Sequence, residues 1–98
     1  MTARLIWHPA AVDEFLAAVG WYEQQRPGLG TEFAAACRSA LTLIQERPEV
    51  FRLVHGELRR VLLRRFPYAI FYRYRETELL VVGVMHERRD PRRWQERR

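Results

Sequence analysis

The sequence predicts a single α+β domain in which a short strand and a helical hairpin precede a three-stranded antiparallel sheet. Apolar residues recur at roughly the 3.6-residue period of a helix up to about residue 46, and at the roughly two-residue period of strands after residue 58. A chain of 98 residues, 48% of them apolar, has room for one hydrophobic core. We therefore treat residues 1–98 as one domain, with the helices packed on one face of the sheet.

The first half of the chain predicts a short strand followed by two antiparallel helices. Residues 4–7 are a β-prone run that ends just before a proline, and proline suits the first turn of a helix. Apolar side chains then recur at helical spacing over residues 9–25, until the Pro- and Gly-rich turn at residues 27–30 breaks the pattern. Thr31 is the expected N-cap of a second helix, which ends near Glu46 because a proline follows.

The second half predicts three antiparallel strands, at residues 58–66, 68–75 and 79–86, with a tight polar turn between the last two. Along the middle strand, alternation separates two sets of side chains: Ile70, Tyr72 and Tyr74 on one face, and Phe71, Arg73 and Arg75 on the other. The last strand is apolar on both faces, which suits a central position in the sheet. The N-terminal strand is expected at an edge.

The charge of the chain is unevenly distributed. All 17 basic residues are arginine, and the formal net charge is +5. Residues 1–50 carry a net charge of −2, whereas residues 51–98 carry +7. Such an asymmetry predicts a polyanionic partner for the second half, either nucleic acid or an acidic protein. Direct binding of nucleic acid by this half of the chain is therefore one functional hypothesis.

Several classes of protein are excluded or disfavoured by composition. The single cysteine, Cys37, allows no internal disulfide and no multi-cysteine zinc site. No pair of His, Cys or acidic residues has the short helical spacing of a zinc motif, so we expect neither a metal nor another cofactor. The apolar runs are shorter than the roughly 20 residues that span a bilayer, and no signal peptide is evident. We therefore expect a cytoplasmic protein without membrane contact.

Two stretches carry a resemblance to a known family. The run RRFPYAIFYR at residues 64–73 is followed by VMHERRDPRRW at residues 84–94. Together with the helical hairpin that begins at Pro9 and ends at residues 46–48, these runs resemble the RelE/ParE superfamily of toxins from bacterial type II toxin–antitoxin modules. The resemblance covers nearly the whole chain. It implies a cognate antitoxin that wraps the domain, and hence a hetero-oligomer.

The superfamily contains both nucleases and binding proteins. Members on the RelE side cut mRNA on the ribosome, whereas members on the ParE side inhibit DNA gyrase. Nucleases of this kind carry an arginine that binds phosphate at the middle strand, where this chain has Ala69. Arg73 lies four residues, or about 13 Å, further along the strand. The resemblance therefore implies a ParE-like gyrase inhibitor that acts by binding.

The alternative is a metal-independent, ribosome-dependent mRNA endonuclease. Such an enzyme must activate a 2′-hydroxyl, stabilise charge on phosphorus and protonate the leaving oxygen. The family's lysine-based version is excluded because the chain has no lysine. The remaining version would use Glu49 or Glu57 as the base, Arg73 for the phosphate and His86 as the acid.

The expected surface for antitoxin or target consists of basic residues together with one histidine and one tryptophan. Two arginines are placed at the end of the first predicted strand of the sheet, two on the middle strand, and the rest in the arginine-rich segment 87–98. Trp21, which lies off the apolar stripe of its helix, is a further candidate for an exposed anchor. The residues of the expected surface are Arg64, Arg65, Arg73, Arg75, His86, Arg88, Arg89, Arg92, Arg93 and Trp94.

Overall fold

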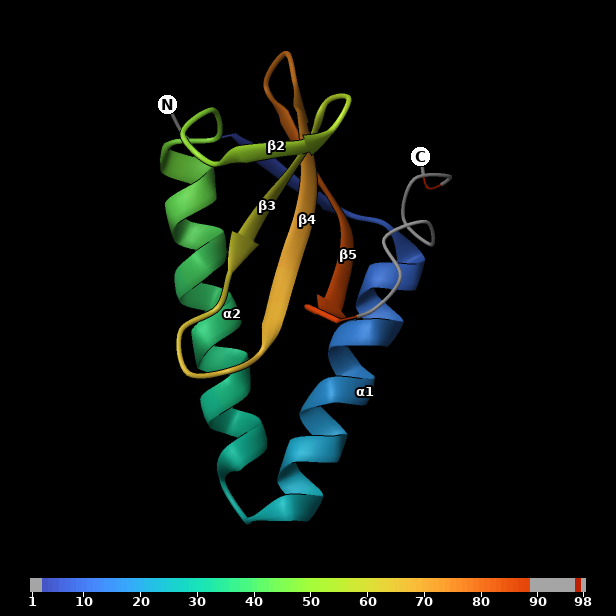
Figure 1. The fold of residues 1–98 in the computed structure, drawn as a ribbon, viewed down its shortest axis with the longest axis vertical. Coiled ribbons are helices and arrows are strands. Elements are labelled where there is room, and N and C mark those ends of the chain that lie inside the picture. The colour runs from blue at the N-terminus through green and yellow to red at the C-terminus, as the bar shows by residue number, and fades with distance from the viewer. Residues whose placement is uncertain (1–2, 89–96, 98) are drawn as a thin grey trace.

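The computed structural model describes residues 3–88 and residue 97, and its two helices pack on one face of a five-stranded sheet (Figure 1). The strand order is β1-β5-β4-β3-β2; β1 pairs with β5 in parallel, and the other neighbours are antiparallel. The elements, in chain order, are β1 (Arg4–Trp7), α1 (Pro9–Gln25), α2 (Leu29–Glu46), β2 (Arg52–His55), β3 (Leu58–Leu62), β4 (Tyr68–Arg75) and β5 (Glu78–His86).

This architecture confirms the predicted α+β class, the helical hairpin and the antiparallel meander of β3, β4 and β5. It also confirms the edge position of β1 and the inner position of β5. Neither of the two helices described is long and apolar enough to cross a membrane. The turn between the helices extends beyond the strands, so the lower part of the hairpin in Figure 1 has no sheet beside it.

The prediction missed one strand. Arg52–His55 forms β2, an edge strand paired with β3 on one side only. Its side chains are mostly exposed, and Leu53 retains 52% of its accessible surface. Only Val54 is partly buried, against the smaller apolar cluster of the sheet. A four-residue edge strand with one such side chain has no repeating alternation of apolar and polar residues, so the sequence carries no period-two signal here.

The first strand of the meander is shorter than predicted. β3 ends at Leu62 rather than at residue 66, because Arg65 adopts a left-handed backbone with φ of 72°. This turn directs Phe66 into the core, where it is 7% exposed. Arg64 and Arg65 are therefore loop residues between β3 and β4, and their predicted position on a strand was wrong.

Helix α2 begins earlier than predicted and is capped from outside. Its N-cap is Gly28, with φ of 91°, rather than Thr31. Glycine has no side chain that could accept a hydrogen bond from the first amides of the helix. The carboxylate of Glu23, in α1, instead accepts hydrogen bonds from the backbone N–H groups of Gly28 and Gly30, each at 3.0 Å. One helix thus supplies the cap of the next, which satisfies amides that would otherwise lack partners.

The helices approach most closely at Gly30. A Cβ atom added there would lie 2.6 Å from the carbonyl oxygen of Val19 in α1. We expect Gly30→Ala to lower the free energy of unfolding by about 1–3 kcal/mol, because backbone must move to relieve the overlap. Gly20→Ala is the matched control, since a Cβ there meets nothing within 4 Å. That change should raise the stability by about 0.5–1 kcal/mol. Urea unfolding of both variants measures the difference, and equal effects would contradict the close approach.

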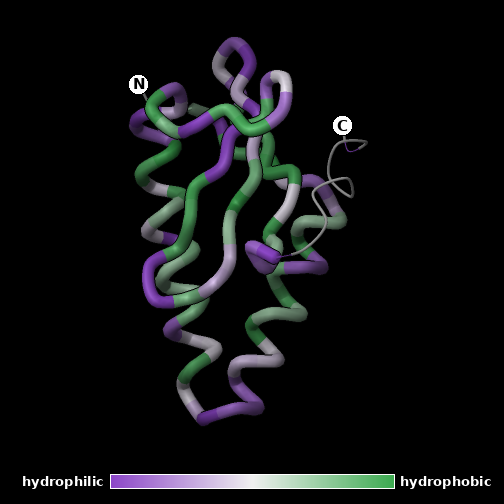
Figure 2. The backbone as a smooth tube through the Cα atoms, viewed as in Figure 1, coloured by the Kyte–Doolittle hydropathy of each residue, from purple (hydrophilic) through white to green (hydrophobic). Residues whose placement is uncertain are grey.

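The core lies mainly between the helices and the sheet. Ile70 and Tyr72 of β4 face the helices, whereas Phe71 packs in a smaller apolar cluster on the opposite face, as the alternation predicted. Tyr72 is fully buried, and its hydroxyl donates to the Pro48 carbonyl oxygen at 2.8 Å. Burial raises the pKa of Tyr72 to about 12. In Figure 2 the turn between the two helices is hydrophilic, whereas hydrophobic segments recur along both helices.

Candidate functional site

The predicted basic surface divides between the two ends of the sheet. In the pairing of β4 with β5, Tyr68 lies opposite His86 at one end, and Arg75 lies opposite Glu78 at the other. Arg73 lies opposite Leu80, six residues before His86, which corresponds to about 20 Å along the strand. The arginines of β4 therefore do not join those that lie near His86.

The end of the sheet near His86 gathers four of the predicted residues. Glu87 N–H donates to the Pro67 carbonyl oxygen at 2.9 Å, which holds the chain after β5 against the β3–β4 loop. The residues gathered here are Arg64, Arg65, His86 and Arg88. The remaining members of the set, Arg89, Arg92, Arg93 and Trp94, lie outside the described residues.

At the opposite end, the two arginines of β4 have different surroundings. Arg75 donates to Glu57 through Nε at 2.6 Å and through Nη2 at 3.4 Å. These bonds lower the pKa of Glu57 below its usual value. Arg73 forms no ion pair with another residue of the described part of the chain. Both side chains of the Arg75–Glu57 pair remain more than half exposed, so the pair contributes little to stability.

The residues of the nuclease alternative are not brought together. Glu49 follows Pro48, whose carbonyl oxygen binds Tyr72, and Tyr72 lies about 13 Å along β4 from the strand end where His86 lies. Arg73 also lies far from His86, as the strand pairing shows. Ala69, at the position of the family's phosphate-binding arginine, is fully buried and pairs with Leu62 and Met85.

His86 lies in a groove of about 660 Å³ between α1 and the ends of β4 and β5. Its ring contacts Tyr68 edge to face at 5.5 Å, and its Nδ1 accepts from Arg88 N–H at 3.2 Å. Trp21 lines the groove and is 54% exposed, in agreement with its prediction as an exposed side chain. We call this the aromatic groove; its principal lining residues are Glu14, Trp21, Tyr22, Tyr68, Met85 and His86.

Glu14, which lines the aromatic groove, accepts a hydrogen bond from the part of β5 that β1 does not cover. β1 pairs with β5 only as far as Val81, which leaves the following backbone groups of β5 without a strand beside them. Glu14 accepts from Val84 N–H at 3.0 Å, and Arg97 donates to the Val82 carbonyl oxygen at 3.0 Å. The two side chains also pair with each other through bonds of 2.7 and 2.8 Å. Sequence reasoning missed this pair, because its members lie 83 residues apart.

A second groove, of about 320 Å³, lies between α2 and β3. We call it the α2–β3 groove; its principal lining residues are Glu32, Ala36, Leu43, Leu62, Arg64 and Arg65. Glu32 accepts from Arg65 at 2.7 Å and from Arg26 at 3.0 Å. These bonds, chiefly the one from Arg65, lower the pKa of Glu32. The pair therefore fixes the β3–β4 loop, and with it Arg64, against α2.

The Glu32 carboxyl is expected to titrate below its usual range, and Arg65→Ala should raise its pKa more than Arg26→Ala does, because the bond from Arg65 contributes most. A pKa lowered in the folded state stabilises the fold above the unfolded-state value, and this contribution is lost as pH falls through the lowered value. NMR titration of the carboxyl groups in the unmodified chain, in Arg65→Ala and in Arg26→Ala measures the pKa of Glu32 in each protein. A larger effect from Arg26→Ala would contradict the geometry.

The described residues offer little basis for metal or thiol chemistry. Within residues 3–88 and 97, no three His, Cys, Asp or Glu side chains are arranged to hold a metal ion. Cys37 is 1% exposed, and burial raises its pKa to about 12. A thiol in that state is a poor nucleophile. The candidate site consists of the two grooves, with Arg64 and Arg65 lining the second and Arg88 following His86 of the first.

Comparison with known proteins places this geometry in a family. The family model described as the ParE toxin of the type II toxin–antitoxin system parDE matches residues 5–91. Among solved structures, a chain of the chromosomal ParDE system from P. aeruginosa is similar, with a TM-score of 0.76 and 16% identity, over 87% of this chain and 96% of that one. A mutant of the E. coli toxin RelE in the free state has a TM-score of 0.65 and 17% identity, over 90% of this chain and 86% of that one. No curated protein matches the sequence.

Proposed function

Because this chain belongs to the ParE toxin family of type II toxin–antitoxin systems, we propose that it arrests growth by binding DNA gyrase and not by cutting RNA. The family implies an antitoxin as a partner. In this proposal the free toxin acts in the cytoplasm, and the complex with the antitoxin is a hetero-oligomer that is inactive.

The observation that supports binding over catalysis is the separation of the ionisable groups that a nuclease would need. Glu49 and Arg73 lie toward one end of β4, whereas His86 lies at the other end. Proton transfer requires the base and the acid within hydrogen-bonding reach of one substrate, and a spacing of more than about 10 Å does not meet that condition. At the position of the family's phosphate-binding arginine, β4 has the buried and uncharged Ala69.

The proposed target contact is the end of the sheet where the aromatic groove opens. Trp21 offers a large exposed ring at the groove, and aromatic side chains surrounded by polar ones often dominate binding energy. Arg88 N–H donates to His86 at this groove, and Arg64 lies in the neighbouring β3–β4 loop, which Glu87 contacts through Pro67. Arg88 belongs to the arginine-rich segment that was predicted to contact antitoxin or target. The arginines would speed association with an acidic surface, while the groove would supply affinity.

Inducing the chain alone in a bacterial host tests this function. We expect filamentation, an SOS response, altered plasmid supercoiling and intact mRNA. Glu49→Gln removes the candidate base but lies outside the proposed contact, so it should leave all four readouts unchanged. Arg64→Glu with Arg88→Glu should weaken the arrest at equal protein level.

Two results would overturn the proposal. One is arrest accompanied by mRNA cuts at codon-defined positions that disappear in Glu49→Gln. The other is the absence of arrest at a protein level confirmed by immunoblot in a host whose gyrase is inhibited by other ParE toxins.

A further inference from the structure

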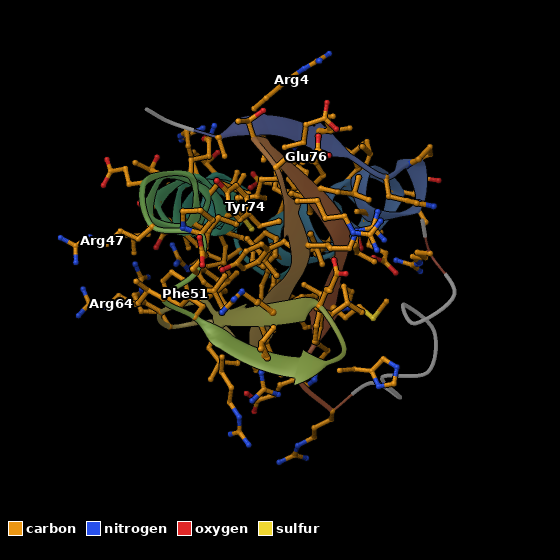
Figure 3. The ribbon with its side chains drawn as sticks, turned by 90° about the horizontal axis from the view of Figure 1, so that it is seen from above. Arg4, Arg47, Phe51, Arg64, Tyr74 and Glu76 are labelled. Carbon is orange, nitrogen blue, oxygen red and sulfur yellow. The ribbon has the colours of Figure 1, made fainter. Side chains whose placement is uncertain are left out.

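Three arginines lie close together on the face of the sheet that the helices leave uncovered. Arg52 of β2 lies directly opposite Arg60 of β3, and Arg60 in turn lies opposite Phe71 of β4. Arg73 follows Phe71 by two residues and therefore shares its face. Phe71 packs in the apolar cluster on the side away from the helices, which is the side where β2 lies in Figure 3. We call Arg52, Arg60 and Arg73 the sheet arginines.

The positions of the sheet arginines bring like charges together. Directly opposite residues of an antiparallel pair have Cβ atoms about 5 Å apart, and diagonal neighbours have Cβ atoms within about 8 Å. Arg52 and Arg60 are directly opposite, whereas Arg60 and Arg73 are diagonal neighbours. Like charges in directly opposite positions destabilise a sheet. An anion bound between these side chains would relieve that repulsion.

The sheet arginines are not neutralised from within the described part of the chain. Among residues 3–88 and 97, none of them forms an ion pair. The pKa of Glu57 is lowered chiefly by Arg75, which donates to it at 2.6 Å, and to a smaller extent by the charge of Arg73. The neighbouring Arg59, on the other face of β3, donates to two backbone carbonyl oxygens at 2.8 and 2.9 Å. The fold thus uses Arg59 for its own structure and leaves the sheet arginines to an external anion.

The surroundings of the sheet arginines favour a partner that is recognised by charge. Leu58 and Phe71, which lie beside them on this face, are only 8% and 6% exposed. Leu62 is exposed on the same face, but it follows Arg60 on the side away from Arg73. The patch therefore offers little apolar area to anchor a protein and no exposed ring on which an unpaired base could stack. A duplex needs neither, because its sequence-independent affinity comes from phosphates bound by basic side chains.

We propose that the sheet arginines bind the phosphate backbone of duplex DNA, as a contact separate from the one proposed for gyrase at the aromatic groove. The three cations lie on three adjacent strands, and a duplex presents one negative charge per about 1.7 Å of its axis. The planar donor fork of arginine suits phosphate oxygens. Such a contact has no sequence preference, because every base pair carries the same phosphates. On a complex of gyrase with DNA, it would hold the toxin beside the DNA.

Fluorescence anisotropy tests the inference with the full chain and a labelled DNA duplex of about 20 base pairs, in salt from about 50 to 200 mM. We expect the logarithm of the binding constant to fall linearly with the logarithm of the salt concentration. Each phosphate contact contributes about 0.9 to this slope, so replacing all three sheet arginines by glutamine should reduce the slope by about 2–3. At about 100 mM salt, the same change should weaken binding more than about tenfold.

The matched control removes the same charge elsewhere. It combines Arg4→Gln on β1 with Arg38→Gln and Arg47→Gln, which lie on α2 and at its C-terminal end; all three arginines are exposed. Figure 3 shows Arg4 on the side of the protein away from β2. This control should reduce the slope by less than about 1. An equal loss in the two triple variants would show that only the net charge matters, and would overturn the inference.

Arg52→Glu separates the binding of DNA from the stability of the fold. It places a carboxylate directly opposite Arg60, so we expect the melting temperature to rise by roughly 2–6 °C. The same change removes a phosphate contact and should weaken DNA binding at least about fivefold. Unchanged DNA affinity in this variant would overturn the inference. So would a lower melting temperature, since Arg52 would then stabilise the fold.

Two other ligands check the identity of the partner. A single-stranded oligonucleotide of the same length, or polyglutamate with the same number of charges, would displace duplex DNA as the partner if it bound more tightly than the duplex and lost this affinity in the triple variant.

The titration contains no gyrase, so its result is independent of the proposed function. A chain that binds DNA through the sheet arginines and leaves gyrase unaffected would refute the proposed function alone. A chain that inhibits gyrase, but whose triple variant binds DNA equally well, would refute the DNA contact alone.

Discussion

Replacing Phe33 by alanine is expected to lower the free energy of unfolding by about 4 kcal/mol. Phe33 of α2 is fully buried at the centre of an aromatic cluster. Its ring lies 5.1 Å from Tyr22 and from Tyr68, and 5.2 Å from Phe66. Removing the ring leaves a cavity and breaks its contacts with three other rings at once. A domain of this size has little stability to spare for such a loss.

Equilibrium urea unfolding measures the loss, and Phe33→Leu is the conservative control, with an expected cost of about 1–2 kcal/mol. The same cluster supports the aromatic groove, because Tyr22 and Tyr68 line it. We therefore also expect Phe33→Leu to shift the NMR signals of His86, whose ring contacts Tyr68. A loss below about 1 kcal/mol for Phe33→Ala would show that the cluster is not packed as described.

Replacing Glu14 by alanine is expected to cost about 2–3 kcal/mol. The Glu14 and Arg97 side chains are only 22% and 15% exposed, so removal of either partner leaves a charge partly buried without its counterpart. The Val84 N–H also loses its acceptor. Its amide should therefore exchange with solvent faster in Glu14→Ala by a factor greater than the change in global stability explains.

The matched control is Glu78→Ala. Glu78 pairs with Arg4 at 3.5 Å on the surface, where the two side chains are 52% and 76% exposed. Its removal should change the stability by less than about 0.5 kcal/mol. A double-mutant cycle between Glu14 and Arg97 should be strongly non-additive, because the two side chains bind each other and the same strand edge. Additive effects would contradict the arrangement.

The helices and the faces of β4 were predictable because they follow from local periodicity. Helix α1 spans Pro9–Gln25, as the spacing of its apolar residues predicted, and α2 ends at Glu46. What periodicity cannot provide is a contact between distant segments. The Glu14–Arg97 pair, 83 residues apart, is of this kind. The cap that Glu23 supplies to Gly28 and Gly30 is local, but it depends on the conformation of the turn between the helices and not on the period of the apolar residues.

The arrangement of the basic residues was predicted less well than the fold. The sequence was interpreted as one patch, although the tight turn after Arg75 already determines which residues of the two strands lie opposite each other. Counting from that turn puts Tyr68 opposite Met85, and an irregularity between Phe71 and Tyr72 moves its partner by one residue to His86. Either register leaves Arg73 far from His86. The left-handed residue Arg65, which ends β3 early, has no such signal, because glycine is the residue expected at a positive φ.

The central claim is that this member of the ParE family acts on gyrase by binding. Its most direct test is a cleavage assay with purified gyrase, ATP and supercoiled plasmid, to which the purified chain is added. We expect linear DNA to accumulate after detergent and protease treatment, and to decrease when Arg64→Glu is combined with Arg88→Glu. Arg4→Glu combined with Arg38→Glu changes the charge equally outside the proposed contact and should remain active. Unchanged gyrase at an excess of the toxin, with cleavage of mRNA on purified ribosomes, would contradict the account.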